Sequence, residues 1–169
     1  RIYSMAKSRN GDLWIGTSKG LFIFDTFKNL EPIVALESPE GDPVFPAVFA
    51  IKPWKENLLV ATAAGLFVFD PRSAKPTHFY RTDEDTEPFE ATATTDLPIS
   101  RVWSVDPVDD EVFVAGNQGA VKIDMATGRI LASSLDSEAS GDQPIGHVYN
   151  VLALGDGRVF LGTEAGLVE

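Results

Sequence analysis

Residues 10–25 of the chain, Asn-Gly-Asp-Leu-Trp-Ile-Gly-Thr-Ser-Lys-Gly-Leu-Phe-Ile-Phe-Asp, decide the fold. They contain two strand-like apolar runs, Leu13–Thr17 and Leu21–Asp25, joined by a short turn that ends in Gly20. The stretch opens on an Asn-Gly dipeptide, which is typical of tight β-hairpins because Gly tolerates a positive φ. An alternating apolar stretch at residues 2–6 precedes it. The segment therefore predicts three successive antiparallel strands.

The same pattern occurs four times along the chain. The glycines that end the turn between the second and third strands are 45 to 54 residues apart, which is the range of blade repeats in β-propellers. These glycines are Gly20, Gly65, Gly119 and Gly166, and a positive φ is expected at each. Small residues recur near the end of the second strand, at Gly16, Ala61, Ala115 and Gly162, where they would allow neighbouring blades to approach closely. A fourth, outer strand is predicted after the first three copies, at residues 32–36, 77–81 and 129–133.

These repeats predict an all-β protein made of four-stranded antiparallel β-propeller blades. We expect one partial propeller domain over residues 1–169, with blades at about 1–36, 48–81, 101–135 and 147–169, the last incomplete. About three and a half blades are too few for most rings. We therefore expect a fragment of a larger propeller of seven or eight blades, completed by further blades of the parent chain or, alternatively, by another chain.

The composition narrows the classes of function. The net charge of −11 and the scattered basic residues argue against nucleic acid as a partner. The absence of cysteine excludes disulfides and thiol chemistry. No run of eighteen apolar residues is present, so this segment is expected to contain no membrane span.

Residues 10–25 resemble the two-component regulator propeller repeat, in which an Asn-Gly or Asp-Gly turn precedes Leu-Trp-Ile-Gly-Thr, Gly-Leu and a strand ending in Asp. Residues 155–167 resemble it as well, with Phe160 at the Trp position, whereas residues 120–131 are similar to quinoprotein-like propeller repeats. In the first family such propellers usually form the extracytoplasmic sensor region of hybrid two-component proteins. The resemblance thus implies a bacterial, periplasmic or extracellular domain that senses a ligand.

The turns between the second and third strands are expected on the same face as the long connections between blades. The long connections are residues 37–47, 82–100 and 136–146. Long loops on a rigid scaffold commonly carry binding residues. The candidate ligand-binding residues on this face and near the channel are Lys19, Trp103, Asn117, Gln118, Tyr149 and Glu164. Aromatic rings there could stack on a sugar, although packing within the blades is the alternative role.

Neither a catalytic centre, a metal site nor a cofactor is expected in this segment. The acidic stretch at residues 83–90 lacks the ligand spacing of a calcium loop and contains Pro88. The two histidines, His78 and His147, fall on an outer strand and at the start of an inner strand, which argues against a shared zinc or acid–base role.

We therefore predict a non-catalytic ligand-sensing or binding propeller of a two-component signalling protein. Its partner would be an oligosaccharide or another small ligand, or a protein bound on the long-loop face. An alternative is a cell-envelope or secretion scaffold that binds another protein through that face. A third alternative, a quinoprotein-like or lyase enzyme, rests on fold analogy.

Overall fold

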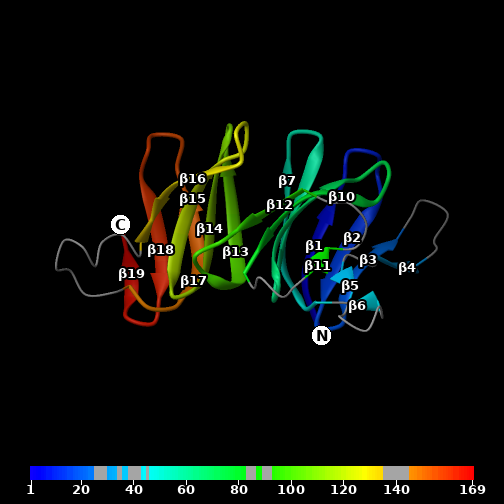
Figure 1. The fold of residues 1–169 in the computed structure, drawn as a ribbon, viewed down its shortest axis with the longest axis horizontal. Coiled ribbons are helices and arrows are strands. Elements are labelled where there is room, and N and C mark those ends of the chain that lie inside the picture. Colours follow the sequence, from blue (N-terminus) through cyan, green and yellow to red (C-terminus); the bar gives the residue numbers. More distant parts are fainter. Residues whose placement is uncertain are drawn as a thin grey trace. The chain divides into compact units, whose positions relative to one another are not determined.

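The computed structural model describes residues 1–24, 30–33, 36–37, 43–44, 46–82, 87–88, 93–134 and 145–169 (Figure 1). Every element in these ranges is a β-strand. The chain divides into two compact units, Arg1–Leu97 and Pro98–Glu169, and each is described by itself. No helix in the described ranges is long and apolar enough to cross a membrane.

The first unit contains two blades, each with its strands in sequence order and neighbouring strands antiparallel. The first blade consists of β1 (Ile2–Lys7), β2 (Leu13–Thr17), β3 (Gly20–Phe24) and β4 (Leu30–Ile33). The second consists of β7 (Val48–Trp54), β8 (Asn57–Thr62), β9 (Gly65–Asp70) and β10 (Lys75–Arg81), with β12 (Ala93–Asp96) added at its outer edge. A small separate sheet joins β11 (Glu87–Pro88), β5 (Leu36–Glu37) and β6 (Pro43–Val44).

The second unit repeats this construction. Its first blade consists of β13 (Ser100–Val108), β14 (Glu111–Asn117), β15 (Gly119–Asp124) and β16 (Arg129–Ser133). The next contains β17 (Val148–Ala153), β18 (Val159–Thr163) and β19 (Gly166–Val168). These up-and-down antiparallel sheets are propeller blades, and the predicted fold class is confirmed.

Two predictions about outer segments were wrong. The stretch 82–100, expected to be a connection, contains β12, which pairs in parallel with β10. Thr95 Oγ1 lies 2.9 Å from His78 Nε2, and Asp96 forms an ion pair with Arg81. Side-chain contacts therefore hold this added strand in addition to its backbone pairing. The first outer strand covers Leu30–Ile33 rather than residues 32–36, because Leu36 pairs with Val44 and Pro88 in the small sheet.

Close packing between adjacent blades forms the cores. In the first unit, Trp14 and Leu21 of one blade pack with Val48, Phe67 and other buried residues of the next. A Cβ built on Gly16 would lie 2.6 Å from Val48 Cγ1. In the second unit, Ala115 packs with Val148 and Val151. The prediction that small residues allow close approach is thus confirmed at Gly16 and Ala115.

The turn glycines have the backbone conformation that the repeat predicted. All four have a positive φ: Gly20 (108°), Gly65 (145°), Gly119 (143°) and Gly166 (117°). At Gly65 there is also no space, since a Cβ would lie 2.1 Å from the carbonyl oxygen of Tyr80. The turn meets the connections on either side of its blade: Ala63 N donates to Ala47 O (2.9 Å), and Thr82 N donates to Ala64 O (3.1 Å). Turns and connections therefore share one face in this blade, as expected.

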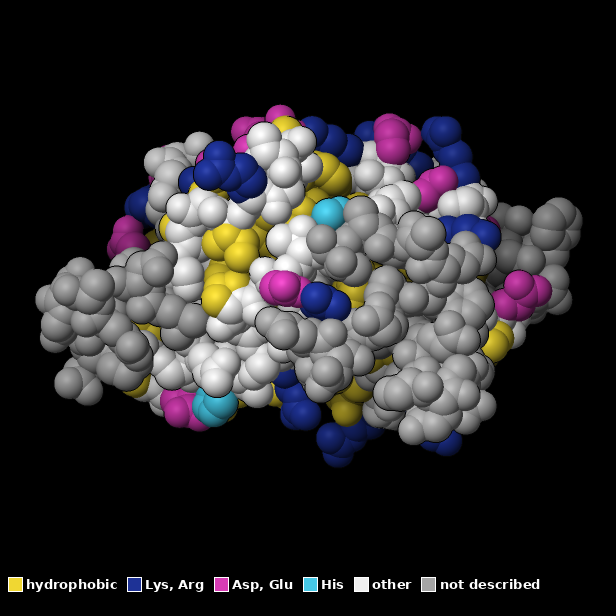
Figure 2. All heavy atoms as spheres, in the orientation of Figure 1, with side chains coloured by type: hydrophobic (Ala, Val, Ile, Leu, Met, Phe, Trp, Pro, Cys, Tyr) yellow, Lys and Arg dark blue, Asp and Glu magenta, His cyan; other side chains and the backbone are white. Residues whose placement is uncertain are grey.

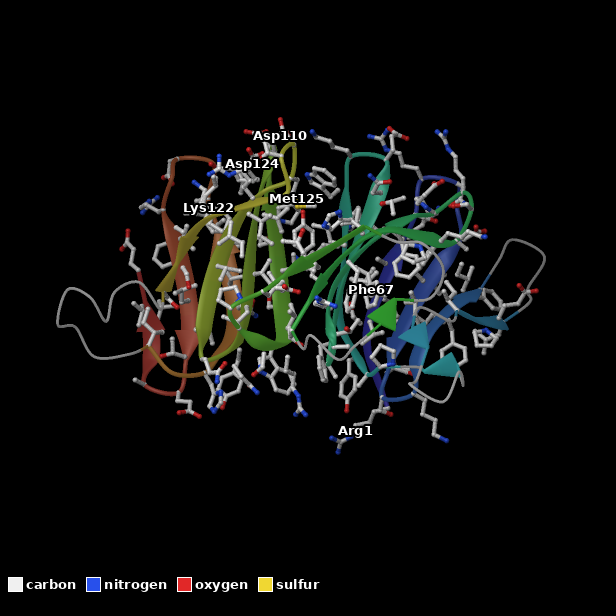
Figure 3. The ribbon with its side chains drawn as sticks, viewed as in Figure 1. Arg1, Phe67, Asp110, Lys122, Asp124 and Met125 are labelled. Atoms are coloured by element: carbon white, nitrogen blue, oxygen red, sulfur yellow. The ribbon has the colours of Figure 1, made fainter. Side chains whose placement is uncertain are left out.

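The loop between the third and fourth strands is held by the aspartate that ends the third strand. Asp124 accepts hydrogen bonds from Ala126 N (2.9 Å) and from Thr127 Oγ1 (2.7 Å). Met125 N donates to Asp110 O (2.9 Å), which ties this loop to the neighbouring hairpin (Figure 3). The bond from Thr127, followed by that from Ala126, lowers the pKa of the Asp124 carboxyl. The equivalent Asp70 is held by Arg72 N and Ser73 Oγ, and its pKa is lowered too.

The charged surface bears on possible partners. In the view of Figure 2, acidic and basic side chains are interspersed, and the visible basic residues do not form a continuous patch. The exclusion of nucleic acid as a partner, made from the net charge of −11, stays a prediction.

The approach of β2 to β7 gives a stability prediction. We expect Gly16→Ala to destabilise the protein by about 1–3 kcal/mol, because the new methyl group would overlap the β-branched side chain of Val48. Urea unfolding measures the effect. Gly155→Ala is the matched control, since nothing lies within 4 Å of a Cβ built there. Equal stability of the two variants would contradict close packing at Gly16.

The aspartate loops give a pH prediction. Because the folded-state pKa of Asp124 lies below the usual value, its stabilising effect is present above the unfolded-state pKa and is lost as the pH falls through the folded-state pKa. We therefore expect Asp124→Ala to be less stable than the parent at neutral pH, with the difference shrinking in acid. Urea unfolding as a function of pH measures this, and Asp70→Ala should show the same trend. A difference that is constant with pH would contradict it.

Candidate functional site

Each inner strand contains a β-bulge at an aromatic residue. In β1, Ile2 pairs with Thr17 and Ser4 with Gly16, so Tyr3 is the extra residue. The register shifts at the same place in the other three inner strands. The four bulged aromatic residues are Tyr3, Phe49, Trp103 and Tyr149. A bulge changes the direction of a side chain relative to the sheet. The repeat therefore gives each blade one aromatic side chain with a direction that differs from the regular alternation of the strand.

The spacing of the flanking residues explains the bulge. Val48 and Ile51 are both buried against the preceding blade, although they are three residues apart. In a regular strand an odd spacing places side chains on opposite faces, so one extra residue between them is needed to restore the phase. Ser4 of the preceding inner strand then accepts a hydrogen bond from Ile51 N (3.0 Å). The ring of Phe49 at this bulge is not part of the core cluster that contains Val48 and Ile51, and it stays partly exposed.

In the second unit, the ring at each bulge is hydrogen-bonded to a residue at the end of the second strand of its own blade or directly after it. Trp103 Nε1 donates to Asn117 Oδ1 (2.8 Å). Tyr149 OH donates to Glu164 Oε1 (3.2 Å). Asn117 and Glu164 occupy the same repeat position, which is Ala63 in the second blade, where the bulged ring is the apolar Phe49. In these three copies, a ring with a hydrogen-bond donor therefore occurs with a turn residue that can accept the bond, and the ring without a donor occurs with an apolar turn residue.

The two hydrogen-bonded rings are neighbours, and each has a charged side chain beside it. The ring centroids of Trp103 and Tyr149 are 6.4 Å apart, with the planes tilted by 54°. Arg101, whose φ is 52°, places its guanidinium 5.5 Å from the Trp103 ring centroid. His147 Nε2 lies 3.8 Å from Glu164 Oε1. Together these groups form a partly exposed aromatic surface, with the Arg101 cation beside one ring and the Glu164 carboxylate beside the other, which we call the bulge cluster.

The bulge cluster perturbs the phenol of Tyr149. Loss of solvent around the hydroxyl group raises its pKa, and the hydrogen bond to Glu164 and the negative charge of that carboxylate raise it further. His147 Nδ1 is buried, and no residue of the described part of the chain forms a hydrogen bond with it.

The structure brings together four of the six predicted ligand-binding residues. Trp103, Asn117, Tyr149 and Glu164 form the centre of the bulge cluster. Gln118 lies beside Asn117 on the exposed turn, with a φ of 72°. Lys19 belongs to the first unit, on an exposed turn where its N–H donates to Thr17 Oγ1 (3.0 Å). Ligand binding by all six stays a prediction.

Sequence reasoning missed Arg101 and set His147 aside. Both lie at or just before the start of an inner strand, where the odd apolar spacing could have indicated a bulge and thus an unusual direction for nearby side chains. His78 is in the first unit, with its ring centroid 4.4 Å from that of Tyr80. No group of three or more His, Asp or Glu residues in the described ranges is arranged to hold a metal ion. Most of the acidic stretch 83–90 lies outside those ranges.

Comparison with known proteins relates the first of these blades to a described repeat family. Residues 1–19 match the family described as "Two component regulator propeller". The predicted resemblance is confirmed over this repeat. No relative was found among curated protein sequences. The similarity of residues 120–131 to quinoprotein-like repeats stays a prediction.

The chain is similar to solved extracellular domains of hybrid two component systems from B. thetaiotaomicron. For BT3049 the TM-score is 0.74 at 19% identity, over 98% of this chain and 22% of that one. For BT4673 it is 0.68 at 19% identity, over 98% and 19%. The computationally designed Ika4 protein gives 0.64 at 15% identity, over 99% and 89%. This chain therefore spans about a fifth of the length of the two bacterial domains, and the similarity establishes a shared fold.

The bond between Tyr149 and Glu164 gives a prediction for the site. We expect Glu164→Gln to lower the pKa of Tyr149, because the negative charge that opposes phenolate formation is removed. The pKa should remain above that of a free tyrosine, since the desolvation persists. Absorbance titration of phenolate, compared with Tyr149→Phe, isolates this residue. Glu111→Gln, whose carboxylate pairs instead with Lys122, should leave the titration unchanged.

Proposed function

We propose that this chain is part of a ligand-sensing propeller in the extracytoplasmic region of a two-component signalling protein, and that it binds its ligand without catalysis. The repeat at residues 1–19 and the fold shared with extracellular domains of hybrid two component systems support the sensor role and the location. The bulge cluster carries the binding hypothesis, because it offers aromatic rings that the blade-to-blade packing does not use.

The chemistry of the bulge cluster favours an oligosaccharide as the ligand. The Trp103 and Tyr149 rings are pre-oriented by hydrogen bonds to Asn117 and Glu164, so little side-chain entropy would be lost on binding. Pyranose rings present apolar C–H faces that stack on aromatic side chains, while their hydroxyl groups bond to carboxylate, amide and guanidinium groups. Arg101, Asn117 and Glu164 supply these groups around the rings.

The ionisable groups of the bulge cluster suit recognition better than reaction. Glu164 accepts a hydrogen bond from the Tyr149 hydroxyl group and also lies near His147. Arg101 lies over a ring face, a cation–π arrangement that orients the indole. Each charged group therefore positions a ring, which is the role expected in a binding surface.

Removal of the Trp103 ring tests the binding role. We expect Trp103→Ala to weaken binding of the best ligand from an oligosaccharide array about tenfold or more, equivalent to about 1.4 kcal/mol, as for a buried aromatic anchor. Isothermal titration calorimetry measures the affinity, and circular dichroism checks the fold. Trp54→Ala is the control, because that ring packs with Lys55 next to a hairpin. Unchanged affinity in folded Trp103→Ala would assign binding to another surface.

A further inference from the structure

The inner strand β13 contains a second β-bulge that β1, β7 and β17 lack. Its register shifts on both sides of Val102, so Arg101 is an extra residue in addition to Trp103. The register of the other three inner strands shifts once each. A bulge changes the direction of the side chain at the extra residue. The second bulge therefore sets the direction of an arginine two residues before a ring of the bulge cluster.

Arg101 has a backbone conformation that usually requires glycine. Its φ is 52°, yet it lies within β13. Residues other than glycine are strained in this conformation, and strain of this kind is often found at functional sites. The other residues besides glycine with a positive φ in the described ranges all lie in turns between two strands, where the turn accounts for it: Lys55, Ala74, Asp109 and Gln118.

The blade formed by β13–β16 also departs from the repeat at the residue next to this bulge. In the other three described blades, the residue that pairs with the turn glycine is a threonine. Its hydroxyl group donates to the carbonyl oxygen of that glycine, at distances of 3.0, 2.8 and 2.9 Å for Thr17, Thr62 and Thr163. In β14 this position is Gly116.

Gly116 provides the space that the bulge at Arg101 needs. A Cβ built on Gly116 would lie 2.7 Å from the carbonyl oxygen of Arg101 and 3.0 Å from that of Ser100. Gly116 does not have a positive φ, so the close approach of the bulged backbone, and not its own conformation, requires glycine. A threonine at this position would collide with the bulge. The blade therefore lacks the threonine bond of the repeat where it accommodates Arg101.

The bulge holds an exposed guanidinium group that has no acidic partner in the described part of the chain. The Arg101 guanidinium lies 5.5 Å from the Trp103 ring centroid and forms no ion pair with a described carboxylate. Acidic residues outnumber basic ones by 25 to 14 in this chain, and four other arginines each pair with one: Arg9, Arg72, Arg81 and Arg158. The N–H donors of Arg101 are thus available to an acceptor that the ligand supplies.

We propose that Arg101 selects ligands with an anionic group, the carboxylate of a uronic acid or a sulfate ester, on a sugar unit stacked against Trp103. This inference rests on the proposed oligosaccharide-binding function and narrows the ligand to an acidic oligosaccharide. The planar guanidinium group donates two parallel hydrogen bonds to such an oxyanion. The Glu164 carboxylate lies beside the other ring, Tyr149, and disfavours a second anionic group there. The anionic unit is therefore expected at Trp103 and a neutral unit at Tyr149.

An array of acidic oligosaccharides, each paired with its neutral counterpart, tests the proposal. Uronates are paired with their carboxyl-reduced forms and sulfate esters with their desulfated forms, so the pair that responds identifies the anionic group. Isothermal titration calorimetry of the full 169-residue chain then measures both members of the best pair. We expect the charged member to bind about tenfold or more tightly, as for hydrogen bonds to a charged group.

Arg101→Gln should abolish this preference by weakening the binding of the charged member alone. Glutamine removes the charge but retains a long polar side chain and the same strained φ. If Arg101→Gln does not fold, Arg101→Gly takes its place, because a φ of 52° is unstrained for glycine. Arg158→Gln is the matched control. Its guanidinium also lies over a ring, 5.9 Å from the Phe160 centroid, but already pairs with Asp156, so the preference should not change.

The outcomes separate this inference from the proposed function. Equal affinity of the parent chain for both members of every pair, or a preference that survives Arg101→Gln, would overturn the role of Arg101 and leave oligosaccharide binding intact. A preference that Arg158→Gln also abolishes would assign it to the overall charge and overturn the inference as well. Binding of no oligosaccharide on the array would overturn both the inference and the proposed function.

Discussion

Within each unit, the structure depends on how closely the inner strand of the second blade approaches the second strand of the blade before it. The approach leaves no room for a side chain at Gly16, where Val48 fills the space, and only a methyl group at Ala115 in the core beside Val148. A hydrogen bond from the inner strand to a serine of the preceding inner strand fixes the same contact along the strand direction. Because the apolar contact and the polar contact must both be made, the relative position of two adjacent blades is strongly constrained.

The bulge, and with it the candidate site, follows from this constraint. Two aliphatic residues three positions apart must both face the preceding blade. The residue that directly follows the first of them is therefore displaced from the regular pleat. An aromatic residue placed there adds little to the interface between blades and remains partly exposed. In the second unit its polar edge is then bonded to the turn of the same blade, so a packing requirement yields a pre-oriented ring.

The sequence predicted what depends on local chemistry. The strands follow from two-residue periodicity, and the turns follow from glycines such as Gly65, whose φ and close neighbour forbid a side chain. Four of the six site residues meet because they recur at two repeat positions, so the spacing of the repeat contained the information. The parallel pairing of β12 with β10 could not be predicted in this way, since it depends on non-local bonds such as that between Thr95 and His78. Arg101 was missed because the direction of its side chain depends on a positive φ, and a positive φ at a residue other than glycine cannot be read from the sequence.

The copies differ at the positions that the packing leaves free. The residue before the bulge is always Ile or Val, and the residue two places after it is Met, Ile or Val, as the blade interface requires. The bulged ring and its turn partner change together, from Phe49 with Ala63 to Trp103 with Asn117 and to Tyr149 with Glu164. Packing alone would not require a polar turn residue to accompany a polar ring. The paired change indicates that the orientation of the ring, and not only its volume, is specified where Trp103 and Tyr149 stand beside Arg101 and His147.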